Sequence, residues 1–265
     1  MPILCYEITG ESSPNDRSTT GAEDGHIAAV LKGDHQEASA QLYSELAANR
    51  LAMFLGIPVL VGVPARRSIE ATAMRFAALR AAEAGLDIYD FTDEDRGDGD
   101  DDEEQEAIEV PDGVYRNTGH VRAMAALCAK YPLEAAAIAV FDLWIGNEDR
   151  ALNFKGQIRG ADRGVIFALD QGSSLLSCRS NVDSSIDLLS RQDYPSFHPF
   201  QKLVNARYCG AMVERVVTMP DWAIEAATVY QDTVGNVILP DQYQCYEALR
   251  ERKTILGRLV DRVLF

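Results

Sequence analysis

Five polar residues occur in an order that suits one kind of chemistry. Lys32 closes a short apolar stretch, and Glu45 follows thirteen residues later in a segment with helical spacing. Asp149 and Asn153 lie in a polar stretch behind a long apolar one, and Asp170 comes twenty-one residues after Asp149. Nucleotide-dependent phosphoryl transfer requires a fixed cation, a carboxylate that positions the nucleophile, and oxygen ligands for a metal ion.

Each of these residues has an expected role in such a reaction. Lys32 would neutralise phosphate charge, and an ion pair with Glu45 would hold the otherwise mobile lysine. Magnesium takes oxygen ligands from one or two side chains, completed by phosphate oxygens and water, and Asn153 and Asp170 could provide them. Asp149 is placed to orient a hydroxyl nucleophile and to accept its proton.

Arg150, next to the expected base, has two candidate partners. Its guanidinium could pair with a phosphate or with an acidic neighbour. Taken singly, these residues all have ordinary explanations as surface charges, exposed helix acids or parts of turns. Their order and the elements between them favour the interpretation as a phosphoryl-transfer site.

The elements that must position these residues change in type along the chain. Strands are predicted by apolar and β-branched stretches at Cys5–Thr9, Ile27–Lys32, Ile57–Val63 and Val165–Leu169. Loops are predicted over Gly10–Gly25, with a hairpin turn at Asp24-Gly25, and over Gly146–Asn153. The alanine-rich stretch Met74–Arg80 fits a strand or a helix.

Helices are predicted where apolar residues recur at helical spacing. They cover Gln36–Leu55, His120–Lys130 and Leu133–Ile145, and the chain from Ser184 onward is mostly helical. Leu133–Ile145 is almost wholly apolar, which indicates a buried helix. With strands in the first third and helices in the last half, the sequence predicts an α+β fold of two lobes.

The composition is that of a globular chain without a membrane segment. Of 265 residues, 47% are hydrophobic and 25% are charged. No apolar run reaches the length of a transmembrane helix, and the first residues do not resemble a signal peptide, so we expect a cytoplasmic protein. Five scattered cysteines without a CxxC pair argue against a disulfide framework or a zinc site. The net charge of −16 argues against binding to nucleic acid or to an anionic membrane.

One segment carries most of that charge. Thr92–Glu109 contains eleven acids and one arginine, and it contributes −10 of the −16. We expect a solvated, disordered insertion here, while a docking site for a basic partner or for divalent cations is the alternative. The chain is thereby divided into an N-terminal nucleotide-binding lobe over residues 1–91, the acidic insertion over 92–114 near the hinge, and a helical catalytic lobe over 115–265.

Three stretches resemble the HipA-like kinase family, a branch of the protein-kinase-like fold that is related to the phosphatidylinositol kinases. Glu23–Lys32 is similar to the family's acidic-glycine turn and lysine strand, and Ser44–Pro58 to its glutamate helix with a Leu-Gly-hydrophobic-Pro exit. Phe141–Arg150, with Phe167–Ser174 behind it, is similar to the catalytic loop and the metal-binding aspartate. The stretches cover well under half of the chain. The resemblance implies a bilobal protein-kinase-like fold with a β-rich N-lobe and a helical C-lobe.

The resemblance also implies ATP and Mg²⁺ as cofactors. It places Lys32 on the ATP phosphates with Glu45 holding it, Asp149 as the catalytic base, and Asn153 and Asp170 as magnesium ligands. The turn between the first two strands would cover the phosphates with hydroxyl and backbone N–H groups, from among Ser12, Ser13, Ser18, Thr19, Thr20 and Gly21.

Two features depart from the protein-kinase pattern. In that pattern the metal-binding Asn lies five residues after the catalytic Asp. Here Asn153 follows Asp149 by four residues, and Phe154 takes the fifth position. The stretch Ser12–Gly21 also lacks a GxGxxG motif. Both departures bear on activity more than on fold.

The sequence thus predicts an ATP- and Mg²⁺-dependent kinase that phosphorylates Ser or Thr of a protein, itself included. Self-modification is expected at serines behind Asp170, where a turn region of small residues would also account for them: Ser173, Ser174, Ser177, Ser180, Ser184 and Ser185. The shortened catalytic loop keeps open a pseudokinase that binds nucleotide or a partner without transfer. The Asp-Arg loop, shared with phosphatidylinositol kinases, keeps open a lipid or small-molecule kinase.

Overall fold

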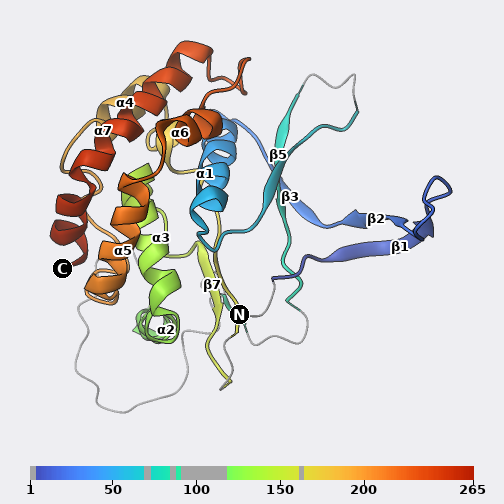
Figure 1. The fold of residues 1–265 in the computed structure, drawn as a ribbon, viewed down its shortest axis with the longest axis horizontal. Helices are drawn as coiled ribbons and strands as arrows, with labels where there is room; N and C mark the ends of the chain where they lie inside the picture. The colour runs from blue at the N-terminus through green and yellow to red at the C-terminus, as the bar shows by residue number, and fades with distance from the viewer. Residues whose placement is uncertain (1–3, 69–72, 84–87, 91–117, 161–163) are drawn as a thin grey trace.

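The computed structural model describes residues 4–68, 73–83, 88–90, 118–160 and 164–265. Its strands are β1 (Ile8–Pro14), β2 (Glu23–Ile27), β3 (Ala29–Lys32), β4 (Gly62–Ala65), β5 (Arg75–Leu79), β6 (Ile88–Asp90), β7 (Phe154–Gln157) and β8 (Ile166–Ala168). Its helices are α1 (Gln41–Leu55), α2 (Thr118–Lys130), α3 (Pro132–Ile145), the 3₁₀ turn η2 (Leu175–Ser177), α4 (Val182–Leu189), α5 (Ala206–Val217), α6 (Asp221–Thr228) and α7 (Leu239–Leu264). The chain forms a β-rich lobe and a helical lobe, which confirms the predicted α+β plan (Figure 1).

A three-stranded antiparallel sheet in the order β3-β5-β4 forms the body of the β-rich lobe. Its strand β3 ends at Lys32, which pairs with Phe76 of β5. A single residue, Ala28, separates β3 from β2, and β2 pairs with β1 in an antiparallel hairpin. Every residue of its two strands is exposed, and the hairpin projects away from the body of the molecule at the right of Figure 1. The sheet therefore fixes the backbone of Lys32, whereas the hairpin adds nothing to the core.

Helix α1 lies between the sheet and the helical lobe, with contacts to β4, β5 and α6. Its leucines and alanines favour helix, and it contains neither glycine nor proline. Most of its circumference is buried, Glu45 included. It ends at Gly56, whose left-handed φ of 69° lets the backbone N–H donate to carbonyls of the last turn. The helix therefore carries Glu45 into the space between the lobes.

Helix α3 forms the centre of the helical lobe, in contact with α2, α5 and α7. Its nearly uniform apolar composition suits a helix that is buried on all sides. Ala135 to Ile145 is buried except at position 137, and the single carboxylate in that stretch is Asp142. Gly146, with a φ of 73°, ends the helix and starts the loop that carries Asp149.

A third sheet, in the order β6-β7-β8, joins the helical lobe to the region between the lobes. Strand β7 begins directly after Asn153, and β8 ends two residues before Asp170, so one antiparallel ladder fixes the backbone near both. Val59, from the β-rich lobe, forms a parallel bridge with Ala168. The backbone N–H of Ala168 donates to the carbonyl of Pro58 over 2.8 Å. These contacts tie the two lobes together beside the site.

The helix predictions are confirmed except for one start. α2 and α3 begin within two residues of the predicted helices and end at the predicted residues. The helix predicted from Gln36 begins at Gln41 instead, so the prediction of helix over residues 36–40 is wrong. Before it, His35 and Ala38 form an isolated bridge, and Asp34 accepts a hydrogen bond from the N–H of Leu42. This tight turn uses the backbone groups that an earlier helical turn would need.

The predictions for the N-terminal hairpin are wrong in their bounds. The strand expected over Cys5–Thr9 overlaps β1 only at Ile8 and Thr9, because β1 begins at Ile8 and runs on to Pro14. Much of the expected loop Gly10–Gly25 is strand. Asp24-Gly25 is not the hairpin turn, because both residues lie inside β2 and the chain turns over residues 15–22. Turn-forming residues entered the strands because an exposed ladder is held by backbone pairing and needs no apolar face.

Three further strand predictions differ from the structure in extent. The strand expected over Ile57–Val63 is displaced to β4, which starts at Gly62, because Val59 bridges to β8 instead. The ambiguous stretch Met74–Arg80 contains β5, and the predicted strand Val165–Leu169 contains β8. β6 and β7 were not predicted.

The acidic stretch Thr92–Glu109, and the insertion over 92–114 as a whole, lie outside the described residues. The last strand before it, β6, pairs with β7 rather than with the sheet of the β-rich lobe. The predicted lobe boundary after residue 91 thus falls just beyond a strand that belongs to the connecting sheet, and the three-part division stays a prediction.

Among the described residues, no single helix is both long and apolar enough to cross a membrane. Taken together, α2 and α3 reach that length and apolar composition, but the pair is bent by 112° at the break between them.

Candidate functional site

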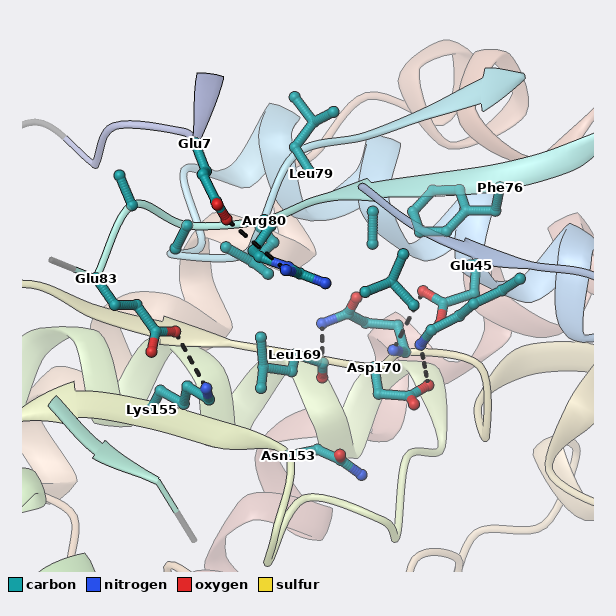
Figure 2. A pocket seen from close by; sticks show the side chains of 17 residues that line it. Glu7, Glu45, Phe76, Leu79, Arg80, Glu83, Asn153, Lys155, Leu169 and Asp170 are labelled. Atoms are coloured by element: carbon teal, nitrogen blue, oxygen red, sulfur yellow. Dashed lines mark hydrogen bonds and ion pairs between the residues drawn. The ribbon is translucent and has the colours of Figure 1, made fainter. Parts of the chain in front are cut away.

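A cavity of about 600 Å³ opens between the two lobes (Figure 2). Its walls come from β3, α1 and β5, from the segment after β5, from the start of β7 and from the segment after β8. Apolar side chains line part of it, among them Val30, Leu60, Ala78 and Leu169. Cavities of this size with an apolar lining and a few polar groups are typical of small-molecule sites.

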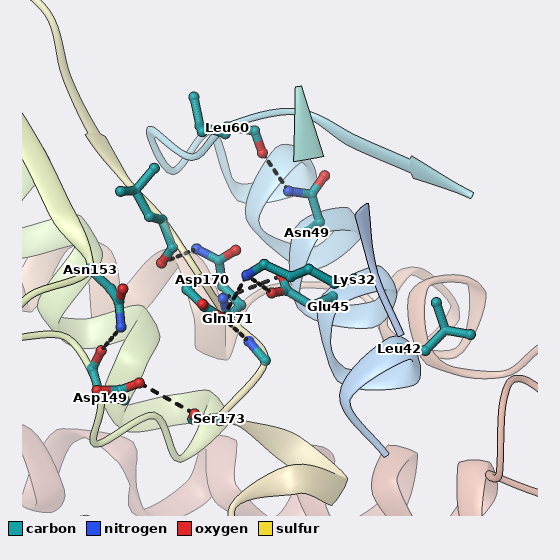
Figure 3. A network of polar contacts seen from close by, with 12 residues as sticks. Lys32, Leu42, Glu45, Asn49, Leu60, Asp149, Asn153, Asp170, Gln171 and Ser173 are labelled. Carbon is teal, nitrogen blue, oxygen red and sulfur yellow. Dashed lines mark hydrogen bonds and ion pairs between the residues drawn. The ribbon is translucent and has the colours of Figure 1, made fainter. Parts of the chain in front are cut away.

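Lys32 lies at one end of this cavity between two carboxylates (Figure 3). Its Nζ is 2.5 Å from Oε1 of Glu45 and 2.8 Å from Oδ1 of Asp170. The Glu45 side chain is only 1% exposed, whereas that of Asp170 is 34% exposed. The structure therefore contains the expected Lys32–Glu45 ion pair, and it adds a second pair that joins the two lobes.

One ammonium shared by two carboxylates shifts all three pKa values. Burial raises the pKa of Glu45 to about 7, and Asp170 adds to the shift while Lys32 opposes it. Burial alone would also raise the pKa of Asp170, but attraction to Lys32 outweighs it and lowers that pKa. For Lys32, burial lowers the pKa and the two carboxylates together more than offset it, so its pKa is raised. Lys32 thus stays charged, and Glu45 is the group that takes up a proton most readily.

Asp170 has a backbone conformation that few residues other than glycine adopt. Its φ is 44°, in the left-handed region, and its Oδ1 accepts a hydrogen bond from the N–H of Gly172 over 3.2 Å. Aspartate tolerates this conformation because its short side chain can bond to the following backbone. The turn aims the carboxylate at Lys32 and the cavity. Such conformations are concentrated at functional sites.

Asp149 lies in the loop after α3. It is bonded to Asn153 but is not itself among the residues that line the cavity. Its backbone N–H donates to Oδ1 of Asn147, and its Oδ2 accepts a hydrogen bond from the Ser173 hydroxyl at 3.4 Å (Figure 3). Burial raises the pKa of Asp149, and the nearby charge of Asp170 raises it further, while Arg150 and the Ser173 hydroxyl partly offset the shift. A carboxylate held in this way is available to accept a proton from a neighbouring hydroxyl.

Asn153 reaches the cavity despite its shortened spacing from Asp149. Its side chain lines the cavity with Asp170, and its Nδ2 donates to the backbone carbonyl of Asp149 over 2.7 Å. Phe154, at the position where the protein-kinase pattern has its Asn, is fully buried at the start of β7. The loop absorbs the missing residue by starting the strand directly after Asn153.

Arg150 does not face the cavity. Its side chain is fully buried, and its Nε and Nη2 donate to the two carboxylate oxygens of Asp142, each over 2.8 Å. Its Nη1 donates to the carbonyls of Asn153 and Leu169. Of the two partners considered for Arg150, the structure shows the acidic neighbour. Arg150 holds the loop of Asp149 and the end of β8 in place, and so it is a positioning residue rather than a phosphate ligand.

Asp142 is the centre of a buried polar cluster that sequence analysis missed. Besides Arg150, its carboxylate accepts a hydrogen bond from Asn147 over 3.0 Å and lies 3.2 Å from Nε2 of His198. Burial would raise the pKa of Asp142, but Arg150 and His198 outweigh it and the pKa is lowered. The signal was present, because an acid inside an almost wholly apolar helix must have a buried partner.

The cavity has further charged residues away from Lys32, which the sequence analysis did not single out. Lys155 of β7 is 3.1 Å from Glu83 (Figure 2) and 2.7 Å from Asp90. Arg80, which Figure 2 shows between this pair and Asp170, is 3.8 Å from Glu7. The cavity wall therefore combines several charged side chains with apolar ones. No local motif surrounds these residues, so the sequence offered little to single them out.

The hairpin residues expected to cover phosphates do not line the cavity. Ser12 and Ser13 lie in β1, where the Ser12 hydroxyl donates to Glu23, and the others lie in the exposed turn: Ser18, Thr19, Thr20 and Gly21. Within that turn the Ser18 hydroxyl accepts hydrogen bonds from backbone N–H groups of Thr20 and Ala22. Their role at phosphates stays a prediction.

The described residues contain no group of three or more His, Cys, Asp or Glu side chains arranged to hold a metal. The two residues expected to hold magnesium, Asp170 and Asn153, both line the cavity. Two oxygen ligands suit Mg²⁺, which completes its shell with phosphate oxygens and water, better than a metal that needs a full protein cage.

Comparison with known proteins supports the fold but does not identify a family. No family model and no curated protein matches the sequence. Among solved structures, the chain is similar to the proinflammatory kinase CtkA of Helicobacter pylori, with a TM-score of 0.51 and 13% identity. The match covers 97% of each chain. The chain therefore has a bilobal kinase-like fold, and the cavity lies between its two lobes.

Proposed function

We propose that this protein is an ATP- and Mg²⁺-dependent kinase that phosphorylates Ser or Thr of a protein substrate. The observation that supports this most strongly is Lys32, held between Glu45 and Asp170 at one end of an interlobe cavity. These two carboxylates keep Lys32 charged and oriented where an anionic ligand would enter the cavity. The likeness in fold to a kinase adds to the argument.

The cavity fits a nucleotide with a magnesium ion. Its volume of about 600 Å³ and its apolar lining residues suit a planar base, and Lys32 supplies a fixed cation for phosphates. Asp170, from the segment after β8, and Asn153, directly before β7, would hold the metal. When bound, Mg²⁺ would neutralise charge that develops on the phosphates during transfer.

Each of these residues would have its own role in phosphoryl transfer. Lys32 binds and orients the phosphates, and Glu45 limits the motion of Lys32. Asp149 orients the acceptor hydroxyl and takes its proton, and its raised pKa makes it a better acceptor than an ordinary aspartate. Arg150, through Asp142, keeps the loop of Asp149 in place.

The first test is the binding of ATP and Mg²⁺, measured by calorimetry on the full chain. Lys32→Ala should weaken ATP binding by about ten- to a hundredfold, because a charge-assisted contact contributes about 1.5–3 kcal/mol. Asp170→Asn should remove the dependence of binding on Mg²⁺. Lys155→Ala is the matched control, since that lysine lines the same cavity but is engaged by Glu83 and Asp90.

Turnover separates a kinase from a pseudokinase. Asp149→Asn should lower phosphoryl transfer by about 100- to 10,000-fold, while ATP binding is retained, because general base catalysis contributes that much. Wild-type protein that binds ATP but transfers nothing to protein, lipid or small-molecule acceptors would be a pseudokinase. Absence of ATP binding by the wild-type chain would overturn the proposed function altogether.

A further inference from the structure

A second cavity lies between the end of α1 and the helical lobe. Its volume is about 640 Å³, and its walls come from α1, from residues 57–61, from the start of α3 and from α5. Apolar side chains line most of it, among them Met53, Leu133 and Met212, and we call this space the rear groove. Cavities of this volume with an apolar lining and few polar groups are typical of small-molecule sites.

The rear groove and the interlobe cavity share one wall. Val59 forms a parallel bridge with Ala168, so the backbone here is extended, and side chains on extended backbone alternate between two faces. Leu60 accordingly lines the interlobe cavity, whereas Val59 and Val61 line the rear groove. The carbonyl of Leu60 accepts a hydrogen bond from the Asn49 side chain, which fixes this segment (Figure 3). A single extended segment therefore separates the two spaces.

Arg215 is the one cationic side chain among the described residues of the rear groove. It lies on α5, and its Nη1 donates to the carbonyl of Leu55 over 2.9 Å. Within the part of the chain that the structure describes, no carboxylate pairs with its guanidinium, and its remaining N–H groups have no protein partner. A guanidinium presents its donors in a planar fork that matches a carboxylate. The rear groove thus contains a cationic group that is available to an anionic ligand.

The acidic side chain in the wall of the rear groove, Glu134, is accounted for by its own helix. It lies in the first turn of α3, where the helix dipole stabilises a negative charge. The net charge of the whole chain, −16, opposes the approach of an anion. A ligand that binds here must therefore add the burial of an apolar body to its contact with Arg215.

We propose that the rear groove binds a carboxylic acid with an apolar body, of the chemical class of the fatty acids. The carboxylate would pair with Arg215, and the hydrocarbon would lie against Met53, Leu133 and Met212. A single guanidinium balances one negative charge, which favours a carboxylate over a phosphate monoester, whose charge is about −1.5 to −2. Removal of the hydrocarbon from water would supply the rest of the affinity.

Occupancy of the rear groove should change the interlobe cavity through the shared wall. A ligand against Val59 and Val61 contacts the segment that presents Leu60 to the interlobe cavity, and Val59 is bridged to Ala168, two residues before Asp170. This coupling rests on the proposed function, in which ATP occupies the interlobe cavity. Coupling between two binding sites is reciprocal, so the carboxylic acid and ATP should change each other's affinity by the same factor.

Calorimetry with decanoate on the nucleotide-free full chain tests the site, at concentrations below those at which decanoate forms micelles. Wild type should bind one decanoate per chain. Arg215→Met should weaken binding by about tenfold, because it removes the charge and keeps an apolar stem. Arg207→Met is the matched control, since Arg207 is an exposed arginine of the same helix that does not line the rear groove. It should bind decanoate as wild type does.

Two analogues separate the contribution of the head group from that of the chain. Decanol has the same hydrocarbon without the charge, so it should bind wild type about tenfold more weakly than decanoate and should bind Arg215→Met and wild type equally. Octanoate keeps the carboxylate but buries fewer methylenes, each of which changes the affinity by about fourfold. The affinity for octanoate should therefore be roughly tenfold lower than that for decanoate.

Methionine methyl signals in NMR spectra locate the bound ligand. Met53 and Met212 lie on different walls of the rear groove, whereas Met124 is fully buried in α2 and does not line it. Decanoate should shift the signals of Met53 and Met212 and leave that of Met124 in place. Ala211→Trp, which adds a large side chain to the wall on α5, should abolish both shifts while its stability to urea stays that of wild type.

The outcomes separate the ligand site from the proposed function. Absence of decanoate binding by wild type, equal affinity in Arg215→Met and wild type, or shifts confined to other methionines would each overturn the site. A protein that self-associates and admits no decanoate would assign the rear groove to a second copy of the chain and overturn it as well. Decanoate bound without any change in ATP affinity would overturn the coupling alone. Absence of ATP binding would overturn the proposed function and leave the carboxylate site intact.

Discussion

At the scale of single residues, the site depends on two carboxylates of unequal burial that compete for one lysine. Asp170 is partly exposed and has the lowered pKa, while Glu45 is buried and has a pKa of about 7. A fully charged triplet inside the protein would leave one negative charge without compensation. Protonation of Glu45 near neutral pH removes that excess charge.

The pH dependence of stability should reveal this buried carboxylate. The pKa of Glu45 rises from 4.5 to about 7 on folding, so its contribution to stability is complete below about pH 4.5 and is lost as the pH rises through 7. Glu45→Gln keeps the protonated shape at every pH. Relative to wild type, its free energy of unfolding should increase by about 3 kcal/mol between these limits.

Urea denaturation of both proteins at a series of pH values measures this difference. The other titrating groups are present in both chains. Lys32 and Asp170, which interact with Glu45, keep their charges over this pH range because the pKa of Lys32 is raised and that of Asp170 is lowered, so their effects cancel as well. A difference that stays constant from pH 4.5 to pH 8 would show that Glu45 ionises normally.

At the scale of elements, the end of α3 is held by a cation that lies far away in the sequence. Arg252 of α7 is 2% exposed and donates to the carbonyls of Leu143 and Trp144, and also to those of Leu189 and Tyr194. Helices end with carbonyls that have no partner within the helix, and a cation there also suits the helix dipole. The loop of Asp149 starts directly after this capped end.

Arg252→Met should therefore destabilise the fold strongly. Each buried carbonyl left without a donor costs about 1–3 kcal/mol, so the free energy of unfolding should fall by more than about 3 kcal/mol. Arg250→Met is the matched control in the same helix. Arg250 is exposed and pairs with Asp221 and Glu247 at the surface, and its loss should change stability little. Equal effects of the two variants, measured by urea denaturation, would contradict this role for Arg252.

At this scale, local elements could be predicted from the sequence, whereas contacts between distant residues could not. The helix of Glu45 and the strand of Lys32 could be predicted because local apolar spacing and a closing glycine mark them. The partner of Arg150 was left open, since a single sequence does not show which distant residue meets it. Arg252 looks like a surface residue of a charged helix, and only packing reveals it as a buried donor. The full extent of the hairpin strands was not predicted because their serine, glycine and aspartate residues favour turns.

At the scale of the whole molecule, the two lobes share α1. The Tyr43 hydroxyl donates to the carbonyl of Thr228, and Arg215 donates to the carbonyl of Leu55, so both ends of α1 are bonded to the helical lobe. Asp34, just before α1, accepts the N–H of Asn236 over 2.8 Å. The helix that carries Glu45 is thus as much a part of the helical lobe as of the β-rich one.

Because of this shared helix, the lobes should unfold together. Scanning calorimetry should show one transition whose calorimetric and van't Hoff enthalpies agree, since neither lobe keeps its core after α1 is lost. The exposed hairpin β1–β2 should not add a transition of its own, because a two-stranded hairpin is marginal in water. Two resolved transitions would show that the lobes are independent.

The cap supplied by Arg252 has a consequence for how the chain is made. A ribosome delivers the protein from its N-terminus, and Arg252 follows Leu143 by 109 residues. While α3 is being synthesised, the carbonyls of Leu143 and Trp144 lack the donor that Arg252 later supplies and must remain hydrated. The nascent chain therefore completes the loop of Asp149 only after α7 has emerged, so the site is among the last parts of the protein to be assembled.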